Sequence, residues 1–132
     1  MQLYNKLSKK ERLDLIHKAG EKRLTLSFYK YSKIKNTFIF RNFLFVHLER
    51  LNVLGRIYIA SEGINAQLSV PGSKLIEFKN LIDSISFLNG VRLNIAIKHS
   101  NEAFLKLKIK IKEKIVADGL NLNDYDLDCL LY

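Results

Sequence analysis

The chain has 132 residues, 48% of them hydrophobic, which predicts one globular domain and excludes a disordered chain. It has no apolar run of the ~20 residues that cross a bilayer, no signal-peptide hydrophobic region and one cysteine, Cys129, so we expect a soluble cytoplasmic protein without an internal disulfide. Lys and Arg number 22 against 13 acids, and the net charge of +9 favours phosphate-rich partners, most simply nucleic acid.

The first predicted elements are a helix, a strand and a second helix. A capping box, Ser8-Lys-Lys-Glu11, begins a helix over about 8 to 19, and Gly20 ends it. Alternating apolar and polar residues predict a half-buried strand over 23–29. Asn36 can cap a helix over about 37 to 52, whose apolar residues recur at three and four positions, as expected for a helix that packs on a sheet.

A β-hairpin stands at the centre of the sequence. Its predicted strands cover 56–60 and 65–70, and Gly63 in the connection can supply the positive φ of a tight turn. Pro71 closes the second strand because it has no N–H to donate. A helix over about 73 to 86 and a strand over 91–97 follow, with a turn at Asn89-Gly90 between them.

The order β-α-β-β-α-β predicts an α+β, ferredoxin-like sandwich of acylphosphatase-like architecture with an extra N-terminal helix. Right-handed crossovers favour parallel pairing of the strands that they connect. Residues 105–112 alternate strictly between apolar residues and lysine, which predicts a fifth, C-terminal strand. Its lysine row at Lys106, Lys108, Lys110 and Lys112 either protects a sheet edge from aggregation or binds phosphates.

A second group of candidates surrounds the end of the first strand. Tyr29 and Tyr31 alternate with lysines, Lys30 among them, as in single-stranded RNA platforms where rings stack on bases and charges follow the backbone. The alternative is that the tyrosines pack across the sheet edge. The positive charge also has an alternative explanation, codon bias, because an excess of Lys, Ile and Asn (16, 14 and 11 residues) is what A/T-rich codons produce.

Catalytic patterns are scarce. The sequence has no Ser/His/Asp arrangement, no phosphate-binding glycine loop and no metal-ligand spacing among His17, His47 and His99. Glu62, on the hairpin turn, is the one suggestive carboxylate; it could act as an acid or base, accept a hydrogen bond from a base edge, or tie down its own turn. Acylphosphatase activity is not expected, since residues 30–35 contain neither Gly nor Arg.

Five segments together carry a resemblance to one family: Ser-Phe-Tyr-Lys-Tyr at 27–31, Gly-Arg-Ile-Tyr-Ile-Ala at 55–60, Glu-Gly-Ile-Asn-Ala-Gln at 62–67, Arg-Leu-Asn-Ile-Ala at 92–96 and Lys-Ile-Val-Ala-Asp-Gly at 114–119. From about residue 22 to 119 the chain resembles the bacterial rhodanese-domain tRNA uridine hydroxylases. The resemblance implies oxygen-dependent hydroxylation of the wobble uridine of tRNA to 5-hydroxyuridine, with molecular oxygen as co-substrate. Ser61 stands where that family often has His.

In that family a ferredoxin-like N-terminal domain precedes a rhodanese domain, which carries the essential cysteine. The resemblance covers the first of these domains alone, so Cys129 does not correspond to that cysteine, and no catalytic, cofactor or metal residue is implied in this chain. We expect a helical extension over 1–21, the ferredoxin-like domain over 22–117 and, over 118–132, the start of a linker to an absent rhodanese domain.

The expected function is tRNA binding or substrate orientation within the hydroxylase, with tRNA and the rhodanese domain as partners and no membrane. The alternative is a non-catalytic truncated remnant or scaffold domain that packs on a rhodanese domain without binding RNA. The candidate residues for tRNA binding or substrate orientation are Tyr29, Lys30, Tyr31, Arg56, Glu62, Asn65, Lys106, Lys108 and Lys110.

Overall fold

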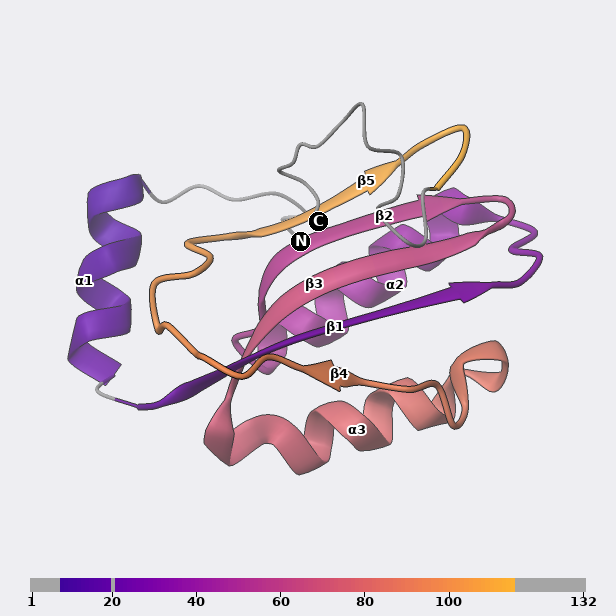
Figure 1. The fold of residues 1–132 in the computed structure, drawn as a ribbon. Helices are drawn as coiled ribbons and strands as arrows, with labels where there is room; N and C mark the ends of the chain where they lie inside the picture. Colours follow the sequence, from indigo (N-terminus) through magenta and orange to yellow (C-terminus); the bar gives the residue numbers. More distant parts are fainter. Residues whose placement is uncertain (1–7, 20, 116–132) are drawn as a thin grey trace.

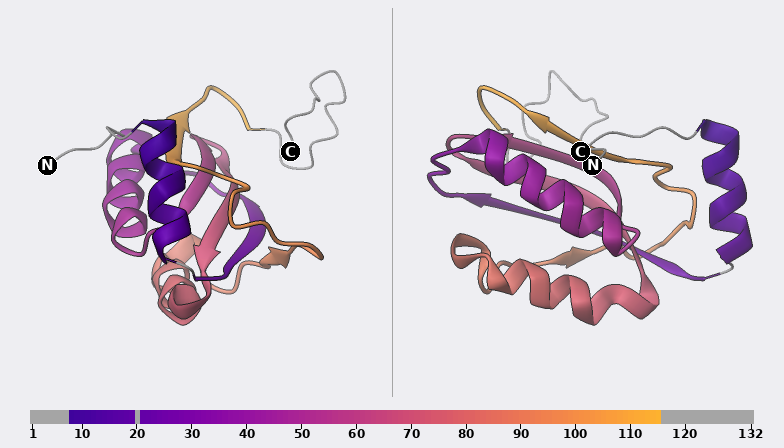
Figure 2. Two further views of the ribbon diagram at one scale, coloured as in Figure 1. Left: turned by 90° about the vertical axis from the view of Figure 1, so that its left-hand side faces the viewer. Right: turned by 180° about the vertical axis from the view of Figure 1, so that it is seen from behind.

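A computed structural model describes residues 8–19 and 21–115; the predicted linker and Cys129 lie outside these residues. Five strands form one sheet, and two helices cover one of its faces (Figures 1 and 2). The elements in chain order are α1 (Lys9–Ala19), β1 (Arg23–Tyr31), α2 (Thr37–Arg50), β2 (Leu54–Ala60), β3 (Gly63–Pro71), α3 (Leu75–Ser84), β4 (Asn94–Ile95) and β5 (Leu107–Ile111), with single 3-10 turns at Gly72–Lys74 and Ser86–Leu88 on either side of α3. The α+β ferredoxin-like prediction, with its extra helix and fifth strand, is confirmed.

The strand order is β4-β1-β3-β2-β5. The expectation of parallel pairing through the crossovers is wrong for the strands β1 to β4, which pair only antiparallel with one another. β1 and β2 run parallel, but β3 lies between them and pairs antiparallel with both; β1 likewise lies between β3 and β4. The tight β2–β3 hairpin inserts its second strand into the gap that the first crossover leaves. Parallel pairing occurs only between β2 and the added edge strand β5.

The core lies between the sheet and the helices α2 and α3. Alternation puts Leu26 and Phe28 of β1 on the helix side, where they meet Leu44, Leu48 and other buried side chains. Asn36 accepts a hydrogen bond from the Ile39 amide at 3.0 Å and so begins α2 as predicted. The capping box of α1 also forms, because Ser8 and Glu11 each accept the other's amide proton. α1 stands beyond the end of the sheet where β1 begins (Figure 1).

The strand predicted over 91–97 is too long: β4 has two residues. Beyond it, side chains replace backbone acceptors along β1. The Thr25 amide donates to Nδ1 of His99 at 2.8 Å, and the Arg23 amide donates to Oδ1 of Asn101 at 2.9 Å. The segment between β4 and β5 therefore provides hydrogen-bond acceptors for the backbone amides at the edge of β1 without forming a regular strand. Because it forms no strand there, this segment can cross to the other edge of the sheet.

Arg23 is the buried charged side chain of the described residues, 7% exposed. Its guanidinium donates to Oγ and the carbonyl oxygen of Ser69 at 2.8 and 2.9 Å, and also to the Asn52 carbonyl. Burial lowers its pKa from the ordinary range. Arg23 thus fastens the start of β1 to the end of β3 and to the turn after α2.

Candidate nucleic-acid interface

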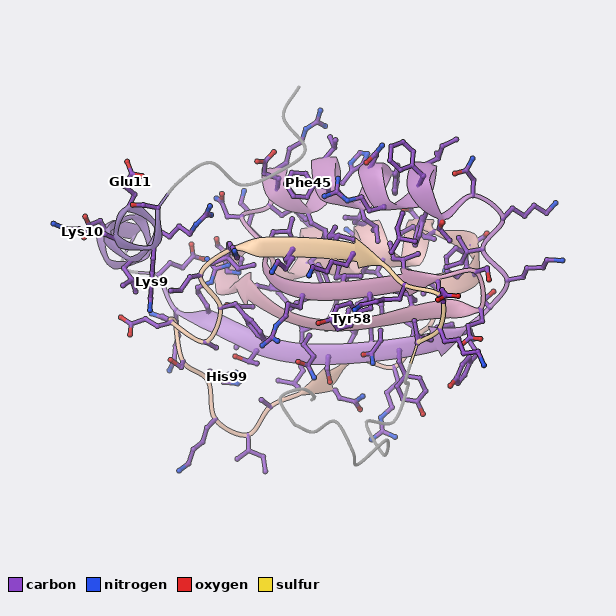
Figure 3. All side chains as sticks on the ribbon, turned by 90° about the horizontal axis from the view of Figure 1, so that it is seen from above. Lys9, Lys10, Glu11, Phe45, Tyr58 and His99 are labelled. Atoms are coloured by element: carbon purple, nitrogen blue, oxygen red, sulfur yellow. The ribbon has the colours of Figure 1, made fainter. Side chains whose placement is uncertain are left out.

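The sheet has a second face, which we call the open face, on the side away from α2 and α3. In Figure 3, Phe45 of α2 lies on the helix side and Tyr58 of β2 lies towards the open face. No helix of the described residues covers the open face (Figure 2). Its side chains come from the polar positions of each alternating strand, so sequence and topology together determine its composition.

The register aligns these side chains in two rows that cross the sheet. The first row passes through directly paired residues of all five strands, in the order Asn94, Ser27, Gln67, Arg56 and Lys108. The second row crosses four strands, in the order Tyr29, Asn65, Tyr58 and Lys110. Neighbouring strands lie ~4.8 Å apart, so the first row is about 19 Å long. Each row begins with neutral polar or aromatic groups and ends in positive charge at β5.

Positive charge gathers at the β5 edge. The charges of Lys110 and Lys106, with smaller contributions from burial and Arg56, lower the pKa of Lys108 from its ordinary value. Such mutual repulsion among cations marks a place where a polyanion would be stabilised. The guanidinium carbon of Arg56 also lies 5.7 Å from the ring centroid of Phe104, and Nζ of Lys112 lies 5.2 Å from that of Tyr58.

Aromatic rings are exposed at the other end of the open face. Tyr29 and Tyr31 are 47% and 57% exposed, and their rings meet edge to face with centroids 6.5 Å apart. They contact one another yet leave much of their surface in solvent. Lys30, between them in the strand, alternates to the opposite side and does not join the rows.

Glu62 does not lie on the open face; it belongs to the hairpin turn. Its side-chain Oε2 accepts a hydrogen bond from the amide of Ile115 at 3.1 Å, and its carbonyl accepts one from Ser32 at 2.9 Å. The next residue, Gly63, has a φ of +155°, and a Cβ there would collide with the carbonyl oxygen of Lys30 and with the side chain of Ile115. Glu62 therefore fixes the segment that follows β5 against the hairpin, a role nearer to the turn-tying alternative than to acid–base chemistry.

The structure thus brings six of the nine candidates together on the open face: Tyr29, Arg56 and Asn65 with Lys106, Lys108 and Lys110, while Tyr31 extends this group at the end of β1. Lys30 and Glu62 fall outside it. Sequence reasoning missed Tyr58 and Gln67, although alternation from Arg56 along β2 predicts the side of Tyr58, and alternation from Asn65 along β3 predicts that of Gln67. Phe104 was also missed, and no sequence pattern marks it, because it lies in the irregular segment between β4 and β5.

Residues 23–115 match the family model described as the UPF0176 acylphosphatase like domain. The chain belongs to this family. Its curated relatives include proteins named tRNA uridine(34) hydroxylase from Pectobacterium carotovorum, 44% identical over 90% of the chain, and from Leptospira interrogans, 49% identical over 80%. The chain spans 34% and 29% of their respective lengths and corresponds to the N-terminal part. The resemblance to the N-terminal domain of the tRNA uridine hydroxylases is therefore confirmed.

Among solved structures, the dark-state BLUF protein BlrB is similar in fold, with a TM-score of 0.52 and 13% identity over 82% of this chain and 88% of that one. This likeness supports the ferredoxin-like arrangement alone. Within the described residues, no three His, Cys, Asp or Glu side chains gather into a metal-binding group. None of the described helices is both long and apolar enough to span a membrane.

Proposed function

We propose that this domain binds tRNA through its open face and orients it for a hydroxylase that acts on the wobble uridine. The observation that carries the proposal is the pair of aligned rows, in which amide and aromatic groups lead across the sheet to a lysine edge. Proteins that bind single-stranded RNA combine rings and amides for the bases with cations for the phosphates. The anticodon loop that holds a wobble base is single-stranded RNA of this kind.

The chemistry of the reaction is assigned to the rest of a longer protein. Support comes from the relatives named tRNA uridine(34) hydroxylase, of which this chain spans about a third. In the proposed enzyme a rhodanese domain is the partner of this one, molecular oxygen is the co-substrate and 5-hydroxyuridine is the product. This domain contributes affinity and orientation, which can supply a large part of catalysis by holding reactants in place.

A second candidate is a scaffold domain that packs on its partner domain without binding RNA. Phe38 and Ile39, near the start of α2, favour it because they are 64% and 63% exposed on the helix side of the molecule. The two candidates use opposite faces. Substituting Phe38 with Ser should weaken association with the partner domain under the scaffold hypothesis, and should leave tRNA affinity unchanged under both.

The experiment is an NMR titration of the isotope-labelled chain with an anticodon stem-loop that contains uridine at the wobble position. The proposal predicts amide shift changes in β2, β3 and β5, with little change in α3. A paired substitution, Arg56→Gln with Lys110→Gln, should abolish most of these changes, whereas Lys79→Gln on α3 is the matched control. Changes confined to the helix side, or no changes at all, would contradict the proposal.

A further inference from the structure

The open face carries a pocket at the end opposite the lysine edge. It has a volume of about 320 Å³ and is lined by Thr25, Ser27, Gln67, Asn94, Ala96 and Phe104, among others. Three of these, Ser27, Gln67 and Asn94, are consecutive members of the first row. The pocket is therefore continuous, by register, with Arg56 and Lys108.

The lining suits the flat, polar-edged ring of a nucleobase. Phe104 supplies an aromatic wall, and base–aromatic stacking is a general source of affinity for single strands. The exposed amide of Asn94 presents a donor and an acceptor, the combination that reads a base edge by paired hydrogen bonds, and Gln67 adds a second amide to the lining. A volume of about 320 Å³ is at the small end of ligand pockets, which favours a one-ring base over a larger ligand.

A buried hydroxyl in this pocket points to a ligand independently of the row. Oγ1 of Thr25 is inaccessible to solvent and has no hydrogen-bond partner among the described residues. Buried polar atoms are nearly always paired, so one without a partner beside a polar pocket requires an explanation. The Thr25 amide is already committed to Nδ1 of His99, which holds this part of β1 in place. A rotation about the Cα–Cβ bond of Thr25 would turn this hydroxyl into the pocket, where a bound base would give it the partner that it lacks.

Phe104 joins the pocket to the positive edge. The same ring that lines the pocket lies 5.7 Å from the guanidinium carbon of Arg56. Arg56 pairs directly with Lys108 on the next strand. A nucleotide whose base enters the pocket would therefore have two cations available for its phosphate and for the next one along the strand.

From these contacts we infer that the pocket binds one unstacked pyrimidine base of single-stranded RNA, with Phe104 as the stacking surface and Thr25, Gln67 and Asn94 as the polar contacts. The inference rests on the proposed function, because it specifies a base-binding subsite within the same tRNA-binding face. It adds a base-dependent contribution to affinity, separate from the charge-dependent contribution of the β5 edge.

The test compares binding of a hexauridine and a hexaadenosine oligoribonucleotide to variants of the whole chain over a salt series. Phe104→Ala should weaken hexauridine binding at least about fivefold, the lower end of stacking contributions, without changing the salt dependence. Phe104→Tyr should restore binding. Thr25→Val, which keeps the side-chain shape, should also weaken hexauridine binding. Ile97→Ser is the matched control, because Ile97 belongs to the same connection and is 98% exposed.

Two results would refute the inference that the pocket binds a base. If Phe104→Ala weakened both oligonucleotides equally and reduced the salt dependence, Phe104 would act only by holding Arg56. If Phe104→Ala and Thr25→Val bound hexauridine like the parent chain, the pocket would not hold a base. The Lys108→Gln variant separates failure of the pocket from failure of the proposed function. If Lys108→Gln weakened RNA binding and Phe104→Ala did not, the base-binding pocket alone would be refuted. If neither substitution changed RNA binding, both the pocket and the tRNA-binding function would be refuted.

Discussion

Lys108 should contribute to RNA affinity while opposing the stability of the fold. It stands in the middle of the lysine edge, and its pKa is lowered chiefly by Lys110 and Lys106. In the free protein its charge is repelled by its neighbours, whereas a bound phosphate would add an attraction to the same charge. Lys108→Gln should therefore weaken RNA binding and raise the free energy of unfolding slightly, by no more than about 0.5 kcal/mol, as expected for a partly exposed position.

The size of the binding effect follows from counterion release. One phosphate contact on a single strand contributes about 0.7 to the slope of log affinity against log salt, so losing it at roughly 0.1 M salt lowers affinity about fivefold. Lys108→Gln should show both the fivefold loss and the shallower slope. The same substitution at Lys106 or Lys110 should in each case remove approximately one further phosphate contact.

Fluorescence anisotropy with a labelled anticodon stem-loop measures both quantities, and urea unfolding measures stability. Lys79→Gln is the matched control, since it removes the same charge from an exposed position on α3. If the Lys108 and Lys79 variants lost equal affinity, net charge alone would explain binding. Lys108→Gln with an unchanged salt slope would show that this side chain contacts no phosphate.

Three further predictions concern the fold that supports the open face. Arg23→Met should lower the free energy of unfolding by about 2–4 kcal/mol in urea, because it removes the guanidinium that donates to Oγ and to the carbonyl oxygen of the buried Ser69. Gly63→Ala should destabilise by at least about 2 kcal/mol in the same assay, since its Cβ has no room beside β1; a neutral result would show that the hairpin can shift. Hydrogen bonds from the hydroxyl and the amide of Ser73 lower the pKa of Glu21. The stabilising effect of this carboxylate is therefore present above the unfolded pKa of about 4.3 and is lost as pH falls through the lower folded value. Glu21→Gln should remove that acid dependence of the melting temperature.

Much of the open face could be predicted from the sequence because strand alternation is local. The period of two is enough to place Tyr29 with Tyr31, and Lys106 with Lys108 and Lys110, on one side of their strands. Which strands lie together is not local. The β2–β3 hairpin inserts β3 between β1 and β2, and only this insertion puts Asn65 between Tyr29 and Tyr58.

The parts that could not be predicted depend on side chains acting in place of backbone. Residues 91–97 alternate as a strand would, yet β4 ends at Ile95 and its role passes to the side chains of His99 and Asn101. Nothing in the spacing of these two residues indicates that they accept protons from β1. For the same reason the position of Phe104 against Arg56, which forms one wall of the pocket, follows from the path of an irregular segment.

The most direct test of the central claim is binding of this chain to a tRNA with uridine at the wobble position, compared over a salt series with a tRNA that has another base there. The account predicts tighter binding to the first tRNA at every salt concentration, with affinity falling as salt rises because the β5 edge contacts phosphates. Equal affinity for the two tRNAs would contradict recognition by this domain. Absence of binding would contradict the tRNA-binding function itself and favour the scaffold.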